Sequence, residues 1–380
     1  MLKEYIDGLF AWEDFMENLK TVSELVSIKS FDTNVNKEII DYLIFTLKNN
    51  VEEIVKIKSD SSNKNNLVVG VNTKLKDIKN VIVLSGHIDT VVADEGKYAT
   101  NPFEAVKVND KLFGLGIIDM KCFFASIIDN IKKIKKLKTP VVISISCDEE
   151  TTLEGVKKIT EFFQKQNIVP GLTIVGEPTS MKFCFESKSC YEYEIEIFGK
   201  SCHSSSPENG INANYIAAKI MIEIEKLNGL IEGISLSCGV VSGGRASNIV
   251  PNYASLKFDI RSKTKLQKDK VIFLIEEKIE ELKNEYKGSE IKLNSKLVIP
   301  PLENKNSDFL NALMVKYDIE EGEFKGGCEA GFFQELGGET VIFGTGDLEL
   351  AHKPNEFMII KKYFEYNQLL MQILNDYCQK

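Results

Sequence analysis

The 380-residue sequence contains no unbroken apolar run of the roughly 18 residues that a membrane-spanning helix needs. Its apolar runs, such as residues 81–84, have the length of a β-strand. An excess of positive charge is also absent, because 47 Lys and Arg residues stand against 56 Asp and Glu residues, for a formal net charge of −9. These absences exclude a bilayer span and argue against nucleic-acid binding by electrostatic attraction.

Paired cysteine motifs are missing too. None of the eight cysteines has C-x-x-C spacing, so the sequence indicates neither a structural zinc knuckle nor a redox motif. The first 20 residues lack the unbroken apolar stretch of a secretory signal, because Glu4, Asp7, Glu13, Asp14 and Glu17 interrupt it. This pattern predicts an N-terminal amphipathic helix. We therefore expect a cytoplasmic protein with reduced thiols.

Short β-rich runs alternate with helical patterns in the first half of the chain. Strands are predicted at residues 54–57, 67–71, 81–85, 141–147 and 172–175, and helices at 37–48, 123–138 and 154–166. This alternation is typical of an α/β fold with a central mixed sheet flanked by helices. The basic residues 132–138 would then be the solvated end of a helix.

From residue 189 the order changes to βαββαβ, which predicts a compact ferredoxin-like unit. Its strands are expected at 191–198, 234–241, 253–261 and 290–294, and its helices at 212–227 and 266–286. A helix (307–315), a strand (340–343) and a closing helix (361–377) follow. We expect a discontinuous domain formed by residues 1–185 and 297–380, with residues 186–296 inserted into it.

Histidine is scarce, and the three histidines lie beside other polar groups: His87, His203 and His352. His87 follows the run VIVLSG, so it is placed at the carboxyl end of a buried strand, where α/β sheets bind ligands. Asp89, two residues later, could accept a hydrogen bond from the other ring nitrogen of a metal-bound imidazole. The alternative is that Asp89 simply begins a turn.

Acidic residues occupy similar places on other strands. Glu149 and Glu150 end the run VVISISCDEE, and Glu177 follows LTIVG. Consecutive carboxylates repel one another unless cations hold them, and one could bind a metal while its neighbour acts as general base, although an acidic loop is the alternative. Asp119 follows a glycine-rich turn and is either a ligand or a helix N-cap. Imidazoles and carboxylates without a thiolate suit zinc, cobalt or manganese.

The motifs GHIDTV, GLGIIDMK, CDEE, GEPTS, CHSSSPENGINAN and AHKPNEF occur in this order around an inserted βαββαβ unit. Together they resemble the dinuclear-zinc metallopeptidase family of acetylornithine deacetylase, succinyl-diaminopimelate desuccinylase, aminoacylase and glutamate carboxypeptidase. The resemblance implies two divalent ions, zinc or cobalt. It assigns His87 and Glu177 to one ion, Glu150 and His352 to the other, and Asp119 to both.

The same resemblance implies catalytic roles for three further residues. Asp89 would orient His87, and Glu149 would take a proton from the attacking water and pass it to the leaving amine. His203 lies in the inserted unit, which would act as a lid, and would stabilise the oxyanion, commonly in the active site of the partner subunit. A homodimer through this lid domain follows. The sequence departs from the family at Leu115 and Cys122, which affects the expected shape of the loop before Asp119.

Substrate-binding residues are implied in the same way. Asn248 and Arg261 match lid positions that contact the substrate carboxylate and oxyanion, and Gly327 and Glu329 belong to a segment like that of acetylornithine deacetylases. Glu329 would pair with a cationic substrate side chain, or else be an exposed loop carboxylate. Arg245, by contrast, stands where those deacetylases often have an acidic residue.

The expected reaction is therefore hydrolysis of a small N-acyl amino acid, with N-acetylornithine giving ornithine and acetate in arginine biosynthesis. The alternatives within the family are a dipeptidase or aminopeptidase and a succinyl-diaminopimelate desuccinylase. An alternative of another class is a non-catalytic homologue that binds an amino-acid derivative.

Overall fold

The computed structural model describes residues 19–31, 35–60, 62–303 and 307–380. The predicted N-terminal amphipathic helix lies outside these residues. The chain divides into two compact units. Among the described residues, the larger unit contains those from 19 to 185 together with 307–324 and 332–380, and the inserted unit contains 186–303 and 325–331. No helix among the described residues is long and apolar enough to span a bilayer.

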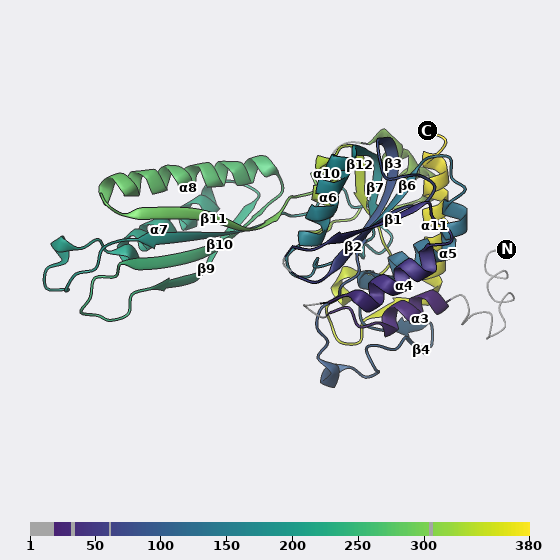
Figure 1. Cartoon of the computed structure of the whole chain (residues 1–380), viewed down its shortest axis with the longest axis horizontal. Coiled ribbons are helices and arrows are strands. Elements are labelled where there is room, and N and C mark those ends of the chain that lie inside the picture. Colours follow the sequence, from purple (N-terminus) through teal and green to yellow (C-terminus); the bar gives the residue numbers. More distant parts are fainter. Residues whose placement is uncertain (1–18, 32–34, 61, 304–306) are drawn as a thin grey trace. The chain divides into compact units, whose positions relative to one another are not determined.

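The larger unit is built on a six-stranded mixed sheet with the order β1-β2-β6-β3-β7-β12 (Figure 1). The strands β6, β3, β7 and β12 run parallel, whereas β1 and β2 pair antiparallel. Their bounds are β1 Glu53–Lys58, β2 Asn65–Gly70, β3 Ile78–His87, β6 Val141–Ser146, β7 Ile168–Val175 and β12 Glu339–Ile342. The strand β6 and the second half of β3 are buried on both faces, so their burial does not alternate along the strand.

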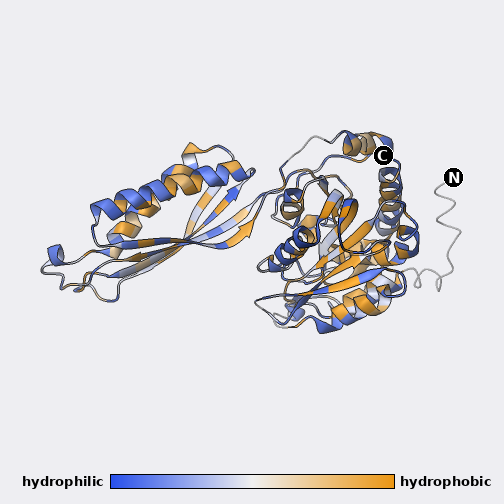
Figure 2. Ribbon diagram, turned by 45° about the horizontal axis from the view of Figure 1, so that its top comes forward, coloured by the Kyte–Doolittle hydropathy of each residue, from blue (hydrophilic) through white to orange (hydrophobic). Residues whose placement is uncertain are grey.

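Helices flank this sheet, and most of them pack their apolar sides into one core with it. Orange segments in Figure 2 show that hydrophobic residues concentrate on the central strands of the larger unit. The helices are α3 Lys20–Ser27, α4 Lys37–Leu47, α5 Cys122–Ile134, α6 Glu154–Gln166, α9 Asp308–Tyr317 and α11 Ile360–Tyr377; the short helix α10, Ala330–Glu335, begins at the boundary with the inserted unit. The predicted fold class is confirmed.

Two local features of the larger unit differ from the prediction. The helix α5 ends at Ile134 instead of residue 138, so the basic run continues beyond the helix. A small sheet of three strands was not predicted: β4 Val106–Val108, β5 Lys111–Phe113 and β13 Phe357–Ile359. Strands of three residues are too short to show a periodic pattern.

The inserted unit is a four-stranded antiparallel sheet with the order β11-β8-β10-β9 and two helices (Figure 1). Its elements are β8 Cys190–Phe198, α7 Ala213–Leu230, β9 Ile234–Gly243, β10 Tyr253–Ser262, α8 Lys265–Glu285 and β11 Glu290–Ile299. This is the predicted βαββαβ unit. The predicted boundary after residue 296 falls within β11, which continues to Ile299 as a partner of β8.

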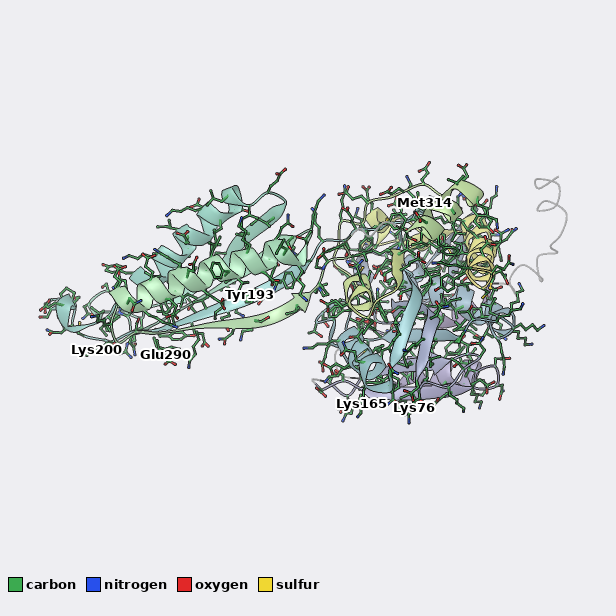
Figure 3. All side chains as sticks on the ribbon, turned by 90° about the horizontal axis from the view of Figure 1, so that it is seen from above. Lys76, Lys165, Tyr193, Lys200, Glu290 and Met314 are labelled. Atoms are coloured by element: carbon green, nitrogen blue, oxygen red, sulfur yellow. The ribbon has the colours of Figure 1, made fainter. Side chains whose placement is uncertain are left out.

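Alternation along the strands explains which sheet face the helices cover. On β8, residues such as Tyr193, Ile195 and Ile197 are buried, whereas the residues between them are only partly buried. Tyr193, labelled in Figure 3, stacks on Phe258 of β10 with ring centroids 5.5 Å apart. The helix α8 begins with a capping box, in which Thr264 and Gln267 bind each other's backbone N–H groups.

We expect Leu84→Ala in β3 to lower the free energy of unfolding of the larger unit by about 2–5 kcal/mol. Leu84 is fully buried between neighbouring strands, so the substitution leaves a cavity. Denaturant unfolding followed by circular dichroism measures the loss. Val315→Ala is the control, because Val315 is 87% exposed, and its effect should stay within about 0.5 kcal/mol. Equal effects of the two substitutions would contradict the assigned core.

Candidate metal centre

Three neighbouring parallel strands bring the predicted site residues to one edge of the sheet. His87 is the last residue of β3, Glu149 and Glu150 follow β6, and Glu177 follows β7. Because β6, β3 and β7 are adjacent and parallel, their carboxyl ends meet at the same edge. The strand order therefore places residues from distant parts of the sequence together.

Asp119 reaches this edge from a buried, irregular segment between β5 and α5. The segment, η2 (Ile117–Lys121), is not regular helix, since Asp119 and Met120 have non-helical dihedral angles. Asp119 makes no N-cap hydrogen bond to α5, so the N-cap alternative is wrong. Gly86 lets the segment approach β3 closely, because a Cβ atom there would lie 2.1 Å from Cε of Met120.

The carboxylate of Asp119 contacts two histidines with its two different oxygens. Its Oδ1 lies 2.9 Å from Nε2 of His87, and its Oδ2 lies 3.0 Å from Nε2 of His352. Glu177 Oε1 lies 4.0 Å from Nε2 of His87, and Glu150 Oε1 lies 2.9 Å from Nε2 of His352. Asp119 is thus common to two clusters of potential ligands.

Each cluster is compact enough to hold one metal ion. The ligand atoms of His87, Asp119 and Glu177 lie within 4.8 Å of one another, and so do those of Asp119, Glu150 and His352. Together the two clusters contain the five predicted metal ligands. Glu149 and Asp89, which are also described, belong to neither cluster. Carboxylate and imidazole donors of this kind suit zinc, cobalt or manganese, so the residues fit a pair of divalent ions.

Asp89 acts on the site differently from the prediction. Its backbone carbonyl, 2.9 Å away, accepts the hydrogen bond from Nδ1 of His87, whereas its carboxylate is 3.7 Å from that nitrogen. The carboxylate instead accepts hydrogen bonds from the backbone N–H groups of Glu149 and Glu150, at 3.3 and 3.1 Å. Because Nδ1 of His87 must donate to a carbonyl, Nε2 is the nitrogen that can bind a metal.

The first acidic residue of the CDEE motif, Asp148, is neutralised by a lysine outside the two ligand clusters. Asp148 forms a buried ion pair with Lys64, and neither side chain is more than 7% exposed. A backbone dihedral φ of 65° at Asp148 marks the sharp turn that separates it from Glu149. The repulsion expected among three consecutive carboxylates is thereby reduced, because Asp148 has a cation of its own.

The carboxylates of the site favour positive charge, as the pKa values of the two histidines and of Asp119 indicate. Burial alone would lower the pKa of His87, but its hydrogen bond with Asp119 and the charges of Glu149, Asp119 and Glu177 together raise that pKa well above its usual value. Hydrogen bonds with Asp119 and Glu150 raise the pKa of His352 to about 10. Burial would raise the pKa of Asp119, but the two histidines together hold it below its ordinary value.

Glu149 shows the opposite behaviour to Asp119. Burial raises the pKa of Glu149 well above its ordinary value, and the neighbouring charges of Glu177, Glu150 and Asp119 raise it further, against the lowering effect of His87. A carboxyl group whose pKa is raised in this way is suited to accept and return a proton near neutral pH.

The remaining predicted residues lie in the inserted unit. His203 and Asn248 are neighbours there, because His203 forms a β-bridge with Ile249 and the N–H of Ser204 donates to the carbonyl of Asn248 at 3.1 Å. Both side chains are exposed. Arg261 forms an ion pair with Asp259, with Nε 2.8 Å from Oδ1.

Gly327 and Glu329 belong to a segment that packs within the inserted unit. A Cβ atom at Gly327 would lie 3.2 Å from the carbonyl oxygen of Lys188. Glu329 has no exposed surface, so the alternative of an exposed loop carboxylate is wrong. A substrate ammonium could not reach Glu329 in this conformation, which does not support its expected role.

Two buried charged residues near the site were given no role by the sequence analysis. Lys121 donates from Nζ to the carbonyl of Ile28 at 2.9 Å, and burial lowers its pKa to about 7. Glu356 accepts backbone hydrogen bonds from the segment around Asp119, and burial raises its pKa to about 8. Glu356 lies in the motif AHKPNEF, so its position was visible in the sequence, but the N–H groups that donate to it were not.

The fold and the site together define a metal-dependent hydrolase. The sequence profile of peptidase family M20/M25/M40 matches residues 83–376, and the chain belongs to this family. It is 30% identical to an acetylornithine deacetylase of Aliivibrio fischeri, over 97% of this chain and 98% of that protein. It is 28% identical to an acetylornithine deacetylase of Buchnera aphidicola, over 95% and 97% of the two chains.

Solved structures show the same fold. A tripeptidase from Staphylococcus aureus superposes with a TM-score of 0.74 at 21% identity, covering 96% of this chain and 99% of that one. A dinuclear metal-binding peptidase of family M20 from Bacillus subtilis superposes with a TM-score of 0.68 at 18% identity, covering 97% and 100%. The predicted family and class of enzyme are confirmed.

We expect divalent metal binding to release about two protons per chain at pH 7, one from each histidine, because both imidazoles must lose the Nε2 proton to bind a metal. The raised pKa values of His87 and His352 keep these protons on the metal-free protein at neutral pH, so metal affinity should rise as pH increases toward 10. Calorimetric titration with Zn²⁺ in two buffers of different ionisation enthalpy measures the release. Identical heats in both buffers would contradict it.

Proposed function

We propose that the protein hydrolyses the amide bond of N-acetylornithine to give ornithine and acetate, a reaction of arginine biosynthesis. The observation that carries this proposal is the Asp119 carboxylate shared between His87 and His352, with Glu149 beside them. The acetylornithine deacetylases that align over nearly the whole chain support this choice of substrate.

In this proposal His87 and Glu177 would hold one ion, Glu150 and His352 would hold the other, and Asp119 would serve both. Ions bound there would polarise the scissile carbonyl and lower the pKa of the attacking water. Zinc or cobalt suits the donor set. The carboxylate of Asp89 accepts hydrogen bonds from the N–H groups of Glu149, the base, and Glu150, a ligand, and so fixes the backbone of both residues.

Glu149 moves the proton. Its carboxylate takes a proton from the attacking water as the water oxygen bonds to the acyl carbon. It then gives that proton to the nitrogen as the C–N bond breaks, so that the amine leaves neutral. Its raised pKa matches this task, because the group must both accept and return a proton near neutral pH.

The inserted unit supplies the second part of the mechanism. Nδ1 of His203 lies 2.8 Å from the hydroxyl of Ser205 and 3.2 Å from its N–H, so Ser205 occupies this nitrogen and leaves Nε2 for other partners. An exposed Nε2–H is a donor that can stabilise the oxyanion formed on the acyl carbon. Asn248, on the neighbouring segment, and Arg261 are proposed to contact the substrate.

A homodimer through the inserted unit is part of the proposal. The strand β9 is at the end of its sheet order, and Val240 and Val241 on it are 53% and 51% exposed. On α7, which packs against β9, Tyr215, Ile222 and Leu230 are also largely exposed. An apolar helix face beside an open strand edge favours pairing with a second copy.

Ile222→Glu is expected to convert the dimer to a monomer, because a charge would be buried at the interface. Sedimentation velocity measures the change, and Val315→Glu, at an exposed position of the larger unit, should remain dimeric. A parent protein that is monomeric and fully active would exclude the dimer.

A second candidate function is hydrolysis of a substrate with an anionic acyl group, as in succinyl-diaminopimelate desuccinylase. The supporting observation is a cavity of about 720 Å³ in the inserted unit, beside the loop that contains Asn248. Among the described residues that line it, Arg245 alone carries a formal charge. An arginine in a cavity lining without acidic residues favours a carboxylate.

A substrate panel separates these candidates and the dipeptidase alternative. N-acetylornithine, N-succinyl-diaminopimelate and dipeptides are compared as substrates of the parent protein and of Arg245→Glu. Faster turnover of N-acetylornithine by both proteins supports the first candidate. A parent preference for the succinyl substrate that Arg245→Glu reverses supports the second, and a preference for dipeptides would exclude both.

We expect Glu149→Gln to lower kcat by about 10²–10⁴-fold while both ions remain bound, since the amide cannot carry the proton. Steady-state kinetics and metal analysis of the same preparation measure both effects. Glu104→Gln, the same change at an exposed position, is the control. Turnover by Glu149→Gln at the parental rate would contradict the mechanism and leave room for a non-catalytic binding protein.

The cellular location is proposed to be the cytoplasm. All eight cysteines are free thiols in the structure, as expected for a protein of a reducing compartment.

A further inference from the structure

Glu356 holds the backbone of the segment that carries Asp119. Its side chain is buried, and its carboxylate accepts hydrogen bonds from the N–H groups of Gly116 (3.0 Å), Ile118 (2.8 Å) and Asp119 (3.4 Å). Its own backbone carbonyl accepts a fourth hydrogen bond, from the N–H of Gly114 at 3.1 Å. One residue therefore binds residues 114–119 at four points.

This segment cannot satisfy the same N–H groups by itself. In a regular helix, carbonyls four residues earlier would accept them, but Gly116 has a left-handed conformation (φ 68°) and Asp119 is not helical. Buried N–H groups without an acceptor are strongly disfavoured. The carboxylate of Glu356 supplies acceptors for these N–H groups in the conformation in which Asp119 reaches the edge of the sheet.

Glu356 is also connected to His352, four residues earlier. His352 and Asn355 both have left-handed backbone conformations, with φ values of 59° and 66°. The side chain of Asn355 accepts a hydrogen bond from the N–H of Ala99 at 2.6 Å, which fixes this short segment to a neighbouring loop. Glu356 thus joins the segment of His352 to the segment of Asp119.

We propose that Glu356 is a positioning residue that sets the place of the Asp119 carboxylate between His87 and His352, and thereby the affinity of both metal positions. It acts through the backbone, since its carboxylate oxygens are occupied by N–H groups and it is absent from both ligand clusters. This inference rests on the ligand roles in the proposed function.

Glu356→Gln tests the proposal, because glutamine has nearly the same size but presents an NH₂ group where one carboxylate oxygen accepted an N–H. We expect Co²⁺ affinity to fall about 10–100-fold at both positions, as for other groups that orient metal ligands. Calorimetric titration of the metal-free protein with Co²⁺ measures this. The visible spectrum of the Co²⁺ protein should also change, since it reports the ligand geometry.

Glu349→Gln is the matched control, because Glu349 is an exposed glutamate three residues before His352 and undergoes the same substitution. Its Co²⁺ affinity and spectrum should equal those of the parent. A Glu356→Gln protein with lower thermal stability but parental Co²⁺ affinity and spectrum would have lost only structural support, and the proposal would be overturned.

Two further results separate a failure of the Glu356 proposal from a failure of the proposed metal centre and from misfolding of the variant. If the parent itself fails to bind a second Co²⁺ ion, the proposed metal centre is wrong, whatever Glu356 does. If Glu356→Gln does not fold, hydrogen exchange of the parent decides: the N–H groups of Gly116 and Ile118 should exchange slowly, and exchange at the rate of an exposed loop would overturn the proposal.

Discussion

The shared carboxylate of Asp119 is the contact on which the rest of the centre depends. Its two oxygens face two histidines that are 265 residues apart in the sequence, one from the end of β3 and one from the segment before β13. Without these cationic partners, the four carboxylates of the site would repel one another: Asp119, Glu149, Glu150 and Glu177. The histidines and carboxylates therefore form a site that is electrostatically prepared for cations.

Rigid elements hold this contact from several directions. The strands β6, β3 and β7 end at one edge, Asp89 clamps the turn that carries Glu149 and Glu150, and Lys64 neutralises Asp148. The strand ends and Asp89 place ligands and the base, and Lys64 removes a neighbouring negative charge. Such support matters because catalysis by a positioned base requires a fixed geometry.

The sequence predicted most of the architecture because strands and helices of this fold have clear periodic patterns. The strand carrying His87 and the βαββαβ order of the inserted unit were visible as apolar runs and alternation. The orienting contact of Asp89 was mispredicted in detail, since sequence spacing cannot distinguish its carbonyl from its carboxylate. The burial of Glu329 was not visible either, because it depends on packing against distant segments.

The roles of Lys64 and Glu356 could not have been predicted from spacing, because their partners, Asp148 and residues 114–119, lie 84 and more than 200 positions away. Charged residues of this kind resemble ordinary surface residues in a sequence that is 27% charged. Only the folded chain shows that both are buried beside the centre.

The most direct test of the shared Asp119 carboxylate is the zinc content of two variants. Each is purified in the presence of Zn²⁺, and its metal content is measured by inductively coupled plasma mass spectrometry. Asp119→Ala removes an oxygen donor from both clusters, whereas His352→Ala removes a ligand from one. If Asp119 serves both metal positions, Asp119→Ala should lose both ions and His352→Ala should keep one. Retention of both ions by a folded Asp119→Ala protein would contradict the shared role of Asp119.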